Sequence, residues 1–139
     1  MFCQPNDYKN LRSVVWPTPL ALFTFIKLSS TAVCHIHKIW MKNSSQISTA
    51  LAKLNLKDPG NIVCYVHGIS CEGWFDVDDN SIHIRFSNSN GDKELLNTMI
   101  HEIIHLSTYD NKLSSAEREN IVEKYMGSEE IQEILKSIK

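Results

Sequence analysis

Residues 101–105, His101-Glu102-Ile103-Ile104-His105, place two histidines and a glutamate close together in the chain. On an α-helix, residues i and i+4 lie one turn apart on the same face, so His101 and His105 can bind one metal ion together. Imidazole nitrogens bind zinc in tetrahedral sites at about 2.0–2.1 Å. Glu102 can accept a proton from a water that the zinc acidifies towards a pKa of about 7. The motif therefore predicts one zinc ion, two histidine ligands and a catalytic glutamate.

The bland alternative is a helix in which two polar positions happen to be histidines. The residues around the motif make this alternative unfavourable, because they predict a buried helix over residues 92–107, capped by Asp92. Its apolar positions are Leu95, Leu96, Met99, Ile100, Ile103 and Ile104. Burying two imidazoles and a carboxylate without partners costs several kcal/mol, whereas one bound metal ion accounts for all three residues.

The elements that must position this motif follow from hydrophobic periodicity. Helices are expected at residues 45–56, 92–107 and 115–126 and after Ser128, and strands at 62–69, 74–77 and 82–86. The last two strands flank a turn-forming cluster and should form a hairpin. Ser114-Ser115-Ala116-Glu117 reads as a capping box that opens the third helix. This order predicts an α+β fold, with a small antiparallel or mixed sheet covered by helices.

On these residues the chain resembles the zincin metallopeptidases, which are named for His-Glu-x-x-His on the active-site helix. The resemblance covers about residues 45–126 and includes the order of elements around the metal helix. The metzincin branch needs Gly and His where this chain has Thr108 and Asn111, so that branch is excluded. The remaining pattern resembles the gluzincin type, whose third ligand is a glutamate on the following helix. Residues 113–119, LSSAERE, are similar to the stretch that follows the motif in small bacterial and phage proteins of this kind.

The resemblance leaves three glutamates as candidates for the third ligand. Glu117 has another role open to it, as the third residue of the capping box. Glu119 lies at the edge of the apolar face of its helix and can point inward, whereas Glu123 lies one turn on, further towards solvent. We expect Glu119 to complete the site, with Glu123 and Glu117 as the alternatives.

Other residues are candidates for supporting roles. Tyr109 or His83 could stabilise the oxyanion of a tetrahedral intermediate. Asp110 could orient a ligand histidine, although loop structuring is an equal alternative. In zincins the strand before the metal helix pairs with extended substrate. The resemblance assigns that part to residues 82–86, which would put His83 and Arg85 beside a peptide.

The leading functional hypothesis is a zinc-dependent metallopeptidase that acts on a peptide or protein substrate. The alternative is a zincin-fold binding or regulatory domain whose metal is structural or lost. No Cys or His follows His105, so no such fourth ligand closes the site. Peptide deformylase also uses His-Glu-x-x-His, but with a cysteine ligand in a Glu-Gly-Cys-Leu-Ser stretch. Here Cys71 precedes Glu72 and Gly73 in the wrong order.

The first forty residues show neither helical nor strand periodicity, and two prolines, Pro17 and Pro19, interrupt them. We expect residues 1–40 to be an N-terminal extension that is poorly ordered or lies outside the core. The domain itself should span residues 41–139, and Met41 is a candidate natural start. The sequence Cys34-His35-Ile36-His37 resembles a metal-binding cluster, but it is expected to be incidental in a segment without a predicted element.

Charge and composition limit the partners. The net charge is −2, but residues 1–57 carry +6 and residues 58–139 carry −8 by count of the printed sequence. The basic residues are dispersed and lack interleaved aromatics, so no nucleic-acid partner is expected. The apolar run at residues 14–26 is too short and too interrupted by proline to insert stably in a membrane. A cytoplasmic protein is expected, with secretion by a signal peptide as the alternative.

Overall fold

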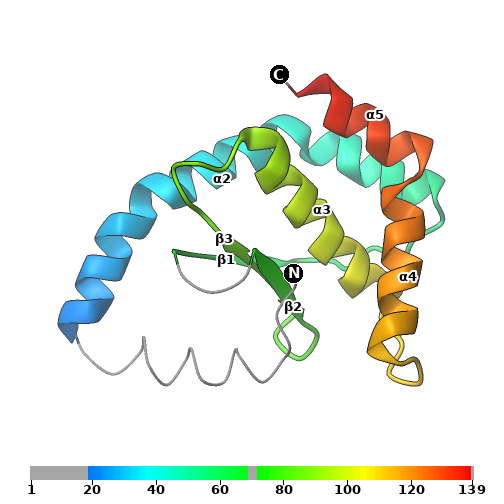
Figure 1. The fold of residues 1–139 in the computed structure, drawn as a ribbon, viewed down its shortest axis with the longest axis horizontal. Helices are drawn as coiled ribbons and strands as arrows, with labels where there is room; N and C mark the ends of the chain where they lie inside the picture. Colours follow the sequence, from blue (N-terminus) through cyan, green and yellow to red (C-terminus); the bar gives the residue numbers. More distant parts are fainter. Residues whose placement is uncertain (1–18, 69–71, 139) are drawn as a thin grey trace.

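The computed structural model of the chain describes residues 19–68 and 72–138, with side chains from residue 31 onward. The elements in chain order are α2 (Pro19–Lys53), β1 (Val63–His67), β2 (Gly73–Asp76), β3 (Ser81–Arg85), α3 (Asp92–Thr108), α4 (Ser115–Met126) and α5 (Glu129–Ser137). In Figure 1 the long α2 arches over α3 and the small sheet, and α4 and α5 lie on the right of the view. The expected α+β fold class is confirmed.

Helix α2 is much longer than the helix expected at residues 45–56. It crosses positions 40 and 41 without a break. One helical stripe of α2 is buried, at Ala32, Ile36, Ile39, Ile47, Ala50 and Leu51. The expectation that residues 1–40 lie outside the core is therefore wrong for residues 31–40, and residues 1–18 lie outside the described part of the chain. Pro19 is compatible with this helix because the first helical position needs no backbone N–H donor.

The sheet has the strand order β1-β3-β2. Strand β3 pairs in parallel with β1 and in antiparallel with β2, so the sheet is mixed and the predicted hairpin is confirmed. The hairpin turn contains Asn80 with a positive φ of 46°. Asp76 Oδ1 accepts hydrogen bonds from the backbone N–H groups of Asp78 and Asp79 at 2.9 and 3.2 Å, which closes the turn.

The starts of α3 and α4 are defined by capping. Ser114 caps α4 as predicted: its Oγ accepts from the Glu117 N–H at 3.3 Å, and its own N–H donates to Glu117 Oε2 at 2.8 Å. The expected cap of α3 was wrong by one residue, because Gly91 is the N-cap and donates its N–H to Glu94 Oε2 at 3.1 Å. The Asp92 carboxylate instead accepts from His35 of α2 at 2.8 Å, with the ring N–H as donor.

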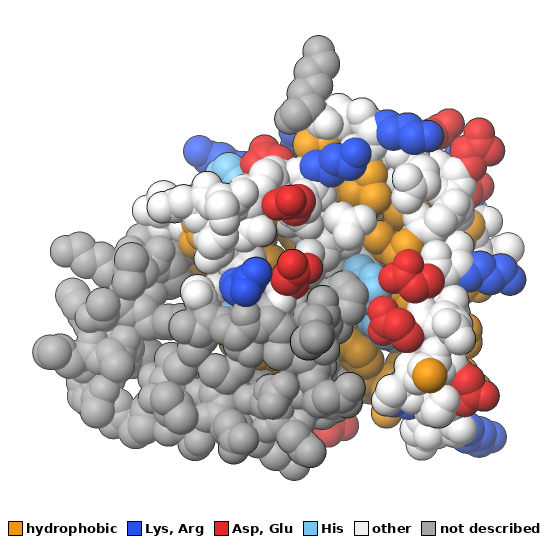
Figure 2. Space-filling view, viewed as in Figure 1, with side chains coloured by type: hydrophobic (Ala, Val, Ile, Leu, Met, Phe, Trp, Pro, Cys, Tyr) orange, Lys and Arg blue, Asp and Glu red, His pale blue; other side chains and the backbone are white. Residues whose placement is uncertain are grey.

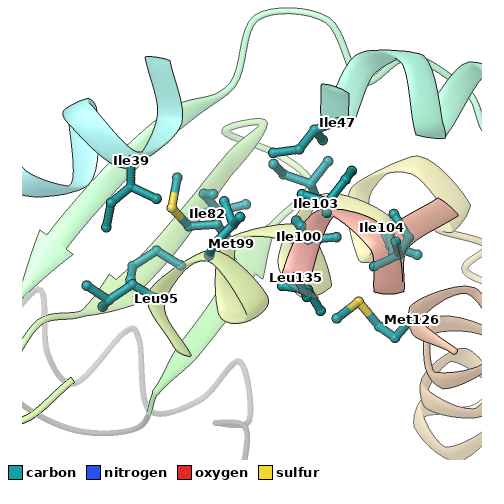
Figure 3. Close-up of a cluster of buried hydrophobic side chains, with 14 of the residues drawn as sticks. Ile39, Ile47, Ile82, Leu95, Met99, Ile100, Ile103, Ile104, Met126 and Leu135 are labelled. Carbon is teal, nitrogen blue, oxygen red and sulfur yellow. The ribbon is translucent and has the colours of Figure 1, made fainter. Parts of the chain in front are cut away.

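Helix α3 lies at the centre of the core. Figure 3 shows its Leu95, Met99, Ile100, Ile103 and Ile104 among side chains of the surrounding elements: Ile39, Ile47, Ile82, Met126 and Leu135. A helix packed on this many sides has little freedom to rotate or shift, so polar groups on it are held in defined directions. Among the described residues, no helix is both long and apolar enough to cross a membrane.

Candidate metal centre

Three side chains from two helices converge beside the C-terminal half of α3. His101 Nε2 lies 3.1 Å from Glu119 Oε1, and His105 Nε2 lies 3.2 Å from Glu119 Oε2. The two Nε2 atoms are 3.2 Å apart. Within the described residues, these three form a group that could hold a metal ion, with one ligand atom each. The structure therefore brings together the three residues expected as ligands.

The spacing of these atoms fits a tetrahedral metal site. Bonds of about 2.0–2.1 Å at the tetrahedral angle place ligand atoms about 3.3–3.4 Å apart. Burial lowers the pKa of His101 to about 4. Burial lowers that of His105 to about 3, with contributions from His101 and Arg118. Both imidazoles are therefore neutral near pH 7. Two neutral ring nitrogens and a carboxylate oxygen that face one another can coordinate one cation.

The choice among the three glutamates follows from their contacts. The Glu117 carboxylate is engaged in the cap of α4, where hydrogen bonds from Ser114 lower its pKa. Glu123 Oε1 lies 3.8 Å from Nδ1 of His101, on the opposite side of the ring from Nε2. Glu119 alone of the three faces both Nε2 atoms. On α4, Glu119 therefore lies on the side that faces both ligand candidates of α3, and Glu123 lies one turn further on, within ion-pair distance of the His101 ring.

Glu102 is the most buried acid near the centre. Its side chain is 1% exposed, and its Oε1 makes no hydrogen bond to any described residue. Burial, with the nearby charge of Glu119, raises the pKa of Glu102 to about 8. This carboxyl group can therefore exchange a proton near neutral pH, which a general base or acid requires.

Strand β2 packs closely against this part of α3. A Cβ added at Gly73 would lie 2.6 Å from Thr98 Cγ2 and 3.0 Å from Glu102 Oε1, so only glycine fits there without a shift. Two residues on, Phe75 stacks on the His105 ring, with centroids 4.6 Å apart and planes 10° apart. Neither Gly73 nor Phe75 was singled out from the sequence. The one local signal was alternation, which places residues 73 and 75 on the same face of the strand.

Several residues expected at the site lie elsewhere. Strand β3 is central and paired on both sides, so residues 82–86 cannot pair with a substrate strand, and that expectation was wrong. The His83 ring stacks on Trp74 at 4.3 Å and on Tyr65 at 4.8 Å. The alternation of β3 places His83 on the face opposite to Ile82 and Ile84, away from α3, so it is not an oxyanion donor at this centre.

The other residues that the sequence suggested for supporting roles make contacts of their own. Asp110 Oδ1 accepts from the Lys112 N–H at 2.9 Å, which structures the loop before α4. Tyr109 is 41% exposed and meets Phe75 edge-on, with centroids 6.1 Å apart. His35 is paired with Asp92, and residues 34–37 form part of α2.

The centre lies close to the molecular surface. Figure 2 shows a patch of histidine (pale blue) bordered by acidic side chains (red). The Glu119 side chain is 38% exposed, which leaves one side of the ligand group open towards solvent. Three protein ligands with an open side are the arrangement of catalytic metal sites, whereas structural sites have four.

Compared with known proteins, the chain matches no family model, no curated protein and no solved structure.

Proposed function

We propose that this chain is a minimal zincin-type, zinc-dependent metallopeptidase. The observation that carries the proposal is the convergence of His101, His105 and Glu119 from two separate helices. The buried carboxyl group of Glu102 is near enough to this group for the charge of Glu119 to raise its pKa. A chance pair of histidines on a helix has no reason to face a carboxylate of another helix at ligand spacing.

The donor set favours zinc. Two imidazoles and one carboxylate are a set used by catalytic zinc sites, and carboxylate-rich oxygen sets suit calcium or magnesium instead. A zinc ion held there would act as a Lewis acid on a peptide carbonyl and lower the pKa of a water molecule towards about 7.

Glu102 supplies the proton transfers. Its Oε1 would accept a proton from the attacking water and donate it to the amine that leaves when the peptide C–N bond breaks. The proton balance closes on this one side chain, because the proton taken in the first step is the one delivered in the second. In the metal-free chain burial raises the pKa of Glu102 to about 8. The charge of a bound zinc ion would lower this pKa again, towards the ionised form that accepts a proton.

The substrate would lie along β2. By resemblance, an extended peptide pairs with a sheet edge beside the metal helix. Among the described residues, β2 is the edge strand that contacts α3 near the centre, through Gly73 and Phe75. A peptide added to this edge would form main-chain hydrogen bonds with β2, which suits a peptide or protein substrate.

Metal analysis and proteolysis of matched variants test the proposal. The full chain should contain about one zinc per molecule and cleave an unstructured protein such as casein. His101→Ala and Glu119→Ala should each retain less than about half an equivalent of zinc. Glu102→Gln should retain zinc and lose turnover by about 100-fold or more. Glu117→Gln, which alters only the helix cap, should keep both zinc and turnover.

The outcomes separate the candidates. A wild-type chain without zinc contradicts the proposal. Zinc bound at the three ligands with no turnover supports the alternative, a zincin-fold binding or regulatory domain with a structural metal. Unchanged turnover in Glu102→Gln contradicts the assignment of the general base.

A further inference from the structure

The two ligand histidines are held by different kinds of neighbour. Nδ1 of His101 lies 3.8 Å from the Glu123 carboxylate, within ion-pair distance but too far for a direct hydrogen bond. No described residue makes a hydrogen bond to Nδ1 of His105. The Phe75 ring of β2 instead stacks on the face of the His105 ring, with centroids 4.6 Å apart and ring planes 10° from parallel.

We propose that Phe75 is the positioning residue of His105, and that stacking takes the place of the hydrogen bond that usually orients a metal-binding imidazole. This inference rests on the proposed metal site and adds the source of its geometry. It requires no substrate, so it can be tested on metal binding alone.

Stacking can do this because of how imidazole binds a metal. The lone pair of Nε2 lies in the ring plane, so rotation about χ2 swings it away from Glu119 and His101. That torsion joins an sp³ to an sp² carbon and has a broad energy profile of its own. The Phe75 ring, stacked on the imidazole with planes 10° from parallel, opposes this rotation in either direction, because tilting the imidazole would bring one of its edges into the Phe75 face.

Phe75 is itself fixed from two sides. In the sheet it is paired with Ile82 of β3, one of the most deeply buried residues. On its open side the Tyr109 ring meets it edge-on at 6.1 Å. The Arg118 guanidinium lies 5.3 Å from the centre of the Tyr109 ring.

Arg118 links the Phe75 and Tyr109 rings to Glu119, the third ligand. Its Nη1 donates to the Leu113 carbonyl at 2.7 Å and to the Asp110 carbonyl at 3.3 Å, which anchors it in the loop between α3 and α4. It directly precedes Glu119 in the first turns of α4. The contacts that hold His105 and those that hold Glu119 therefore share Tyr109 and Arg118. Removing the Phe75 ring should for this reason disturb the positions of both ligands.

The test compares two phenylalanine-to-leucine variants of the full chain. Phe75→Leu keeps an apolar side chain but removes the flat ring from His105. Phe86→Leu is the matched control, because Phe86 is also half-buried, packs on the core and contacts the ring of a histidine that is not a ligand, His35. Zinc Kd is measured by competition with a chelator, and thermal unfolding of the metal-free protein is followed in parallel.

We expect Phe75→Leu to weaken zinc binding by about 10-fold, in line with other substitutions next to metal ligands. Phe86→Leu should change the Kd by less than about 2-fold, although both variants lower the unfolding temperature of the metal-free protein. Phe75→Tyr, which keeps a flat ring, should retain the wild-type Kd. Cobalt(II) bound in place of zinc should show a changed visible spectrum in Phe75→Leu alone, because the spectrum reports ligand geometry.

The outcomes are distinct from those of the proposed function. Wild-type zinc affinity in a folded Phe75→Leu variant overturns the role of Phe75 and leaves the peptidase proposal intact. If Phe75→Leu does not fold, Phe75→Tyr decides: a weakened Kd with the wild-type unfolding temperature overturns the stacking argument. A wild-type chain that binds neither zinc nor cobalt overturns both proposals.

Discussion

Replacing Glu102 with glutamine should stabilise the metal-free protein at neutral pH, although it abolishes the proposed activity. Glu102 is 1% exposed, and burial together with Glu119 raises its pKa from 4.5 to about 8. A carboxyl group whose pKa is raised on folding stabilises the folded state fully below its unfolded pKa. That contribution is lost as the pH rises through the folded pKa. Glutamine has nearly the same shape and carries no charge at any pH, so the variant does not lose this stability as the pH rises.

The magnitude follows from the pKa shift. Each pH unit between 4.5 and 8 removes about 1.4 kcal/mol from the free energy of unfolding of the wild type. From pH 4.5 to pH 7 the loss amounts to about 3 kcal/mol, which is a large fraction of the stability of a small domain. The stability advantage of Glu102→Gln should therefore grow from near zero at pH 4.5 to about 3 kcal/mol at pH 7.

Urea unfolding in the presence of a chelator, at four pH values from 5 to 8, measures this difference. His101 and His105 have lowered pKa values and destabilise the fold as the pH falls below 6.5. They are present in both proteins, so their contribution cancels in the comparison. A difference that stays constant with pH would refute the reasoning, because it would show that the Glu102 carboxylate is not penalised by burial.

Three further predictions concern the elements around the centre. Gly73→Ala should cost about 1–3 kcal/mol of stability in urea unfolding because its methyl group meets Thr98 and Glu102, whereas Gly68→Ala, which has open space, should cost little. Ile36→Ala should cost about 2–5 kcal/mol and Val33→Ala at most about 0.5 kcal/mol, and equal small effects would show that residues 31–40 are not part of the core. Glu117→Ala should lower the unfolding temperature measured by circular dichroism and leave the zinc content unchanged, since its carboxylate serves the helix cap; a loss of zinc would contradict that division of roles.

The features that the sequence predicted correctly are those set by contacts between near neighbours. The i, i+4 spacing of His101 and His105 places them on one helical face in any fold that keeps the helix. The Ser114–Glu117 capping box and the hairpin of β2 and β3 also involve residues close together in the chain. Such features depend on backbone geometry over a few residues, so their patterns can be read without knowing the fold.

The helix over residues 31–40 could have been recognised from the same kind of pattern. Ala32, Ile36 and Ile39 recur at helical spacing and continue the stripe that was recognised from Ile47 onward. The prolines upstream and the polar residue Asn43 interrupt this apolar pattern in the sequence. Asn43 fits the helix because its side chain donates to the Ile39 carbonyl at 2.7 Å, one turn back.

Only the tertiary structure decided how distant segments meet. The resemblance to zincins implies a third ligand on α4, for which Glu119 was favoured and Glu117 and Glu123 were kept open. The packing of α4 against α3 brings Glu119 to both Nε2 atoms and Glu123 only near Nδ1 of His101. The pairing of β1 with β3 makes β3 central and leaves β2 as an edge strand beside α3. The stacking of Phe75 on His105 joins residues thirty positions apart. Periodicity shows which face of an element is buried, but not which partner covers it, because that depends on how all the apolar faces pack together at once.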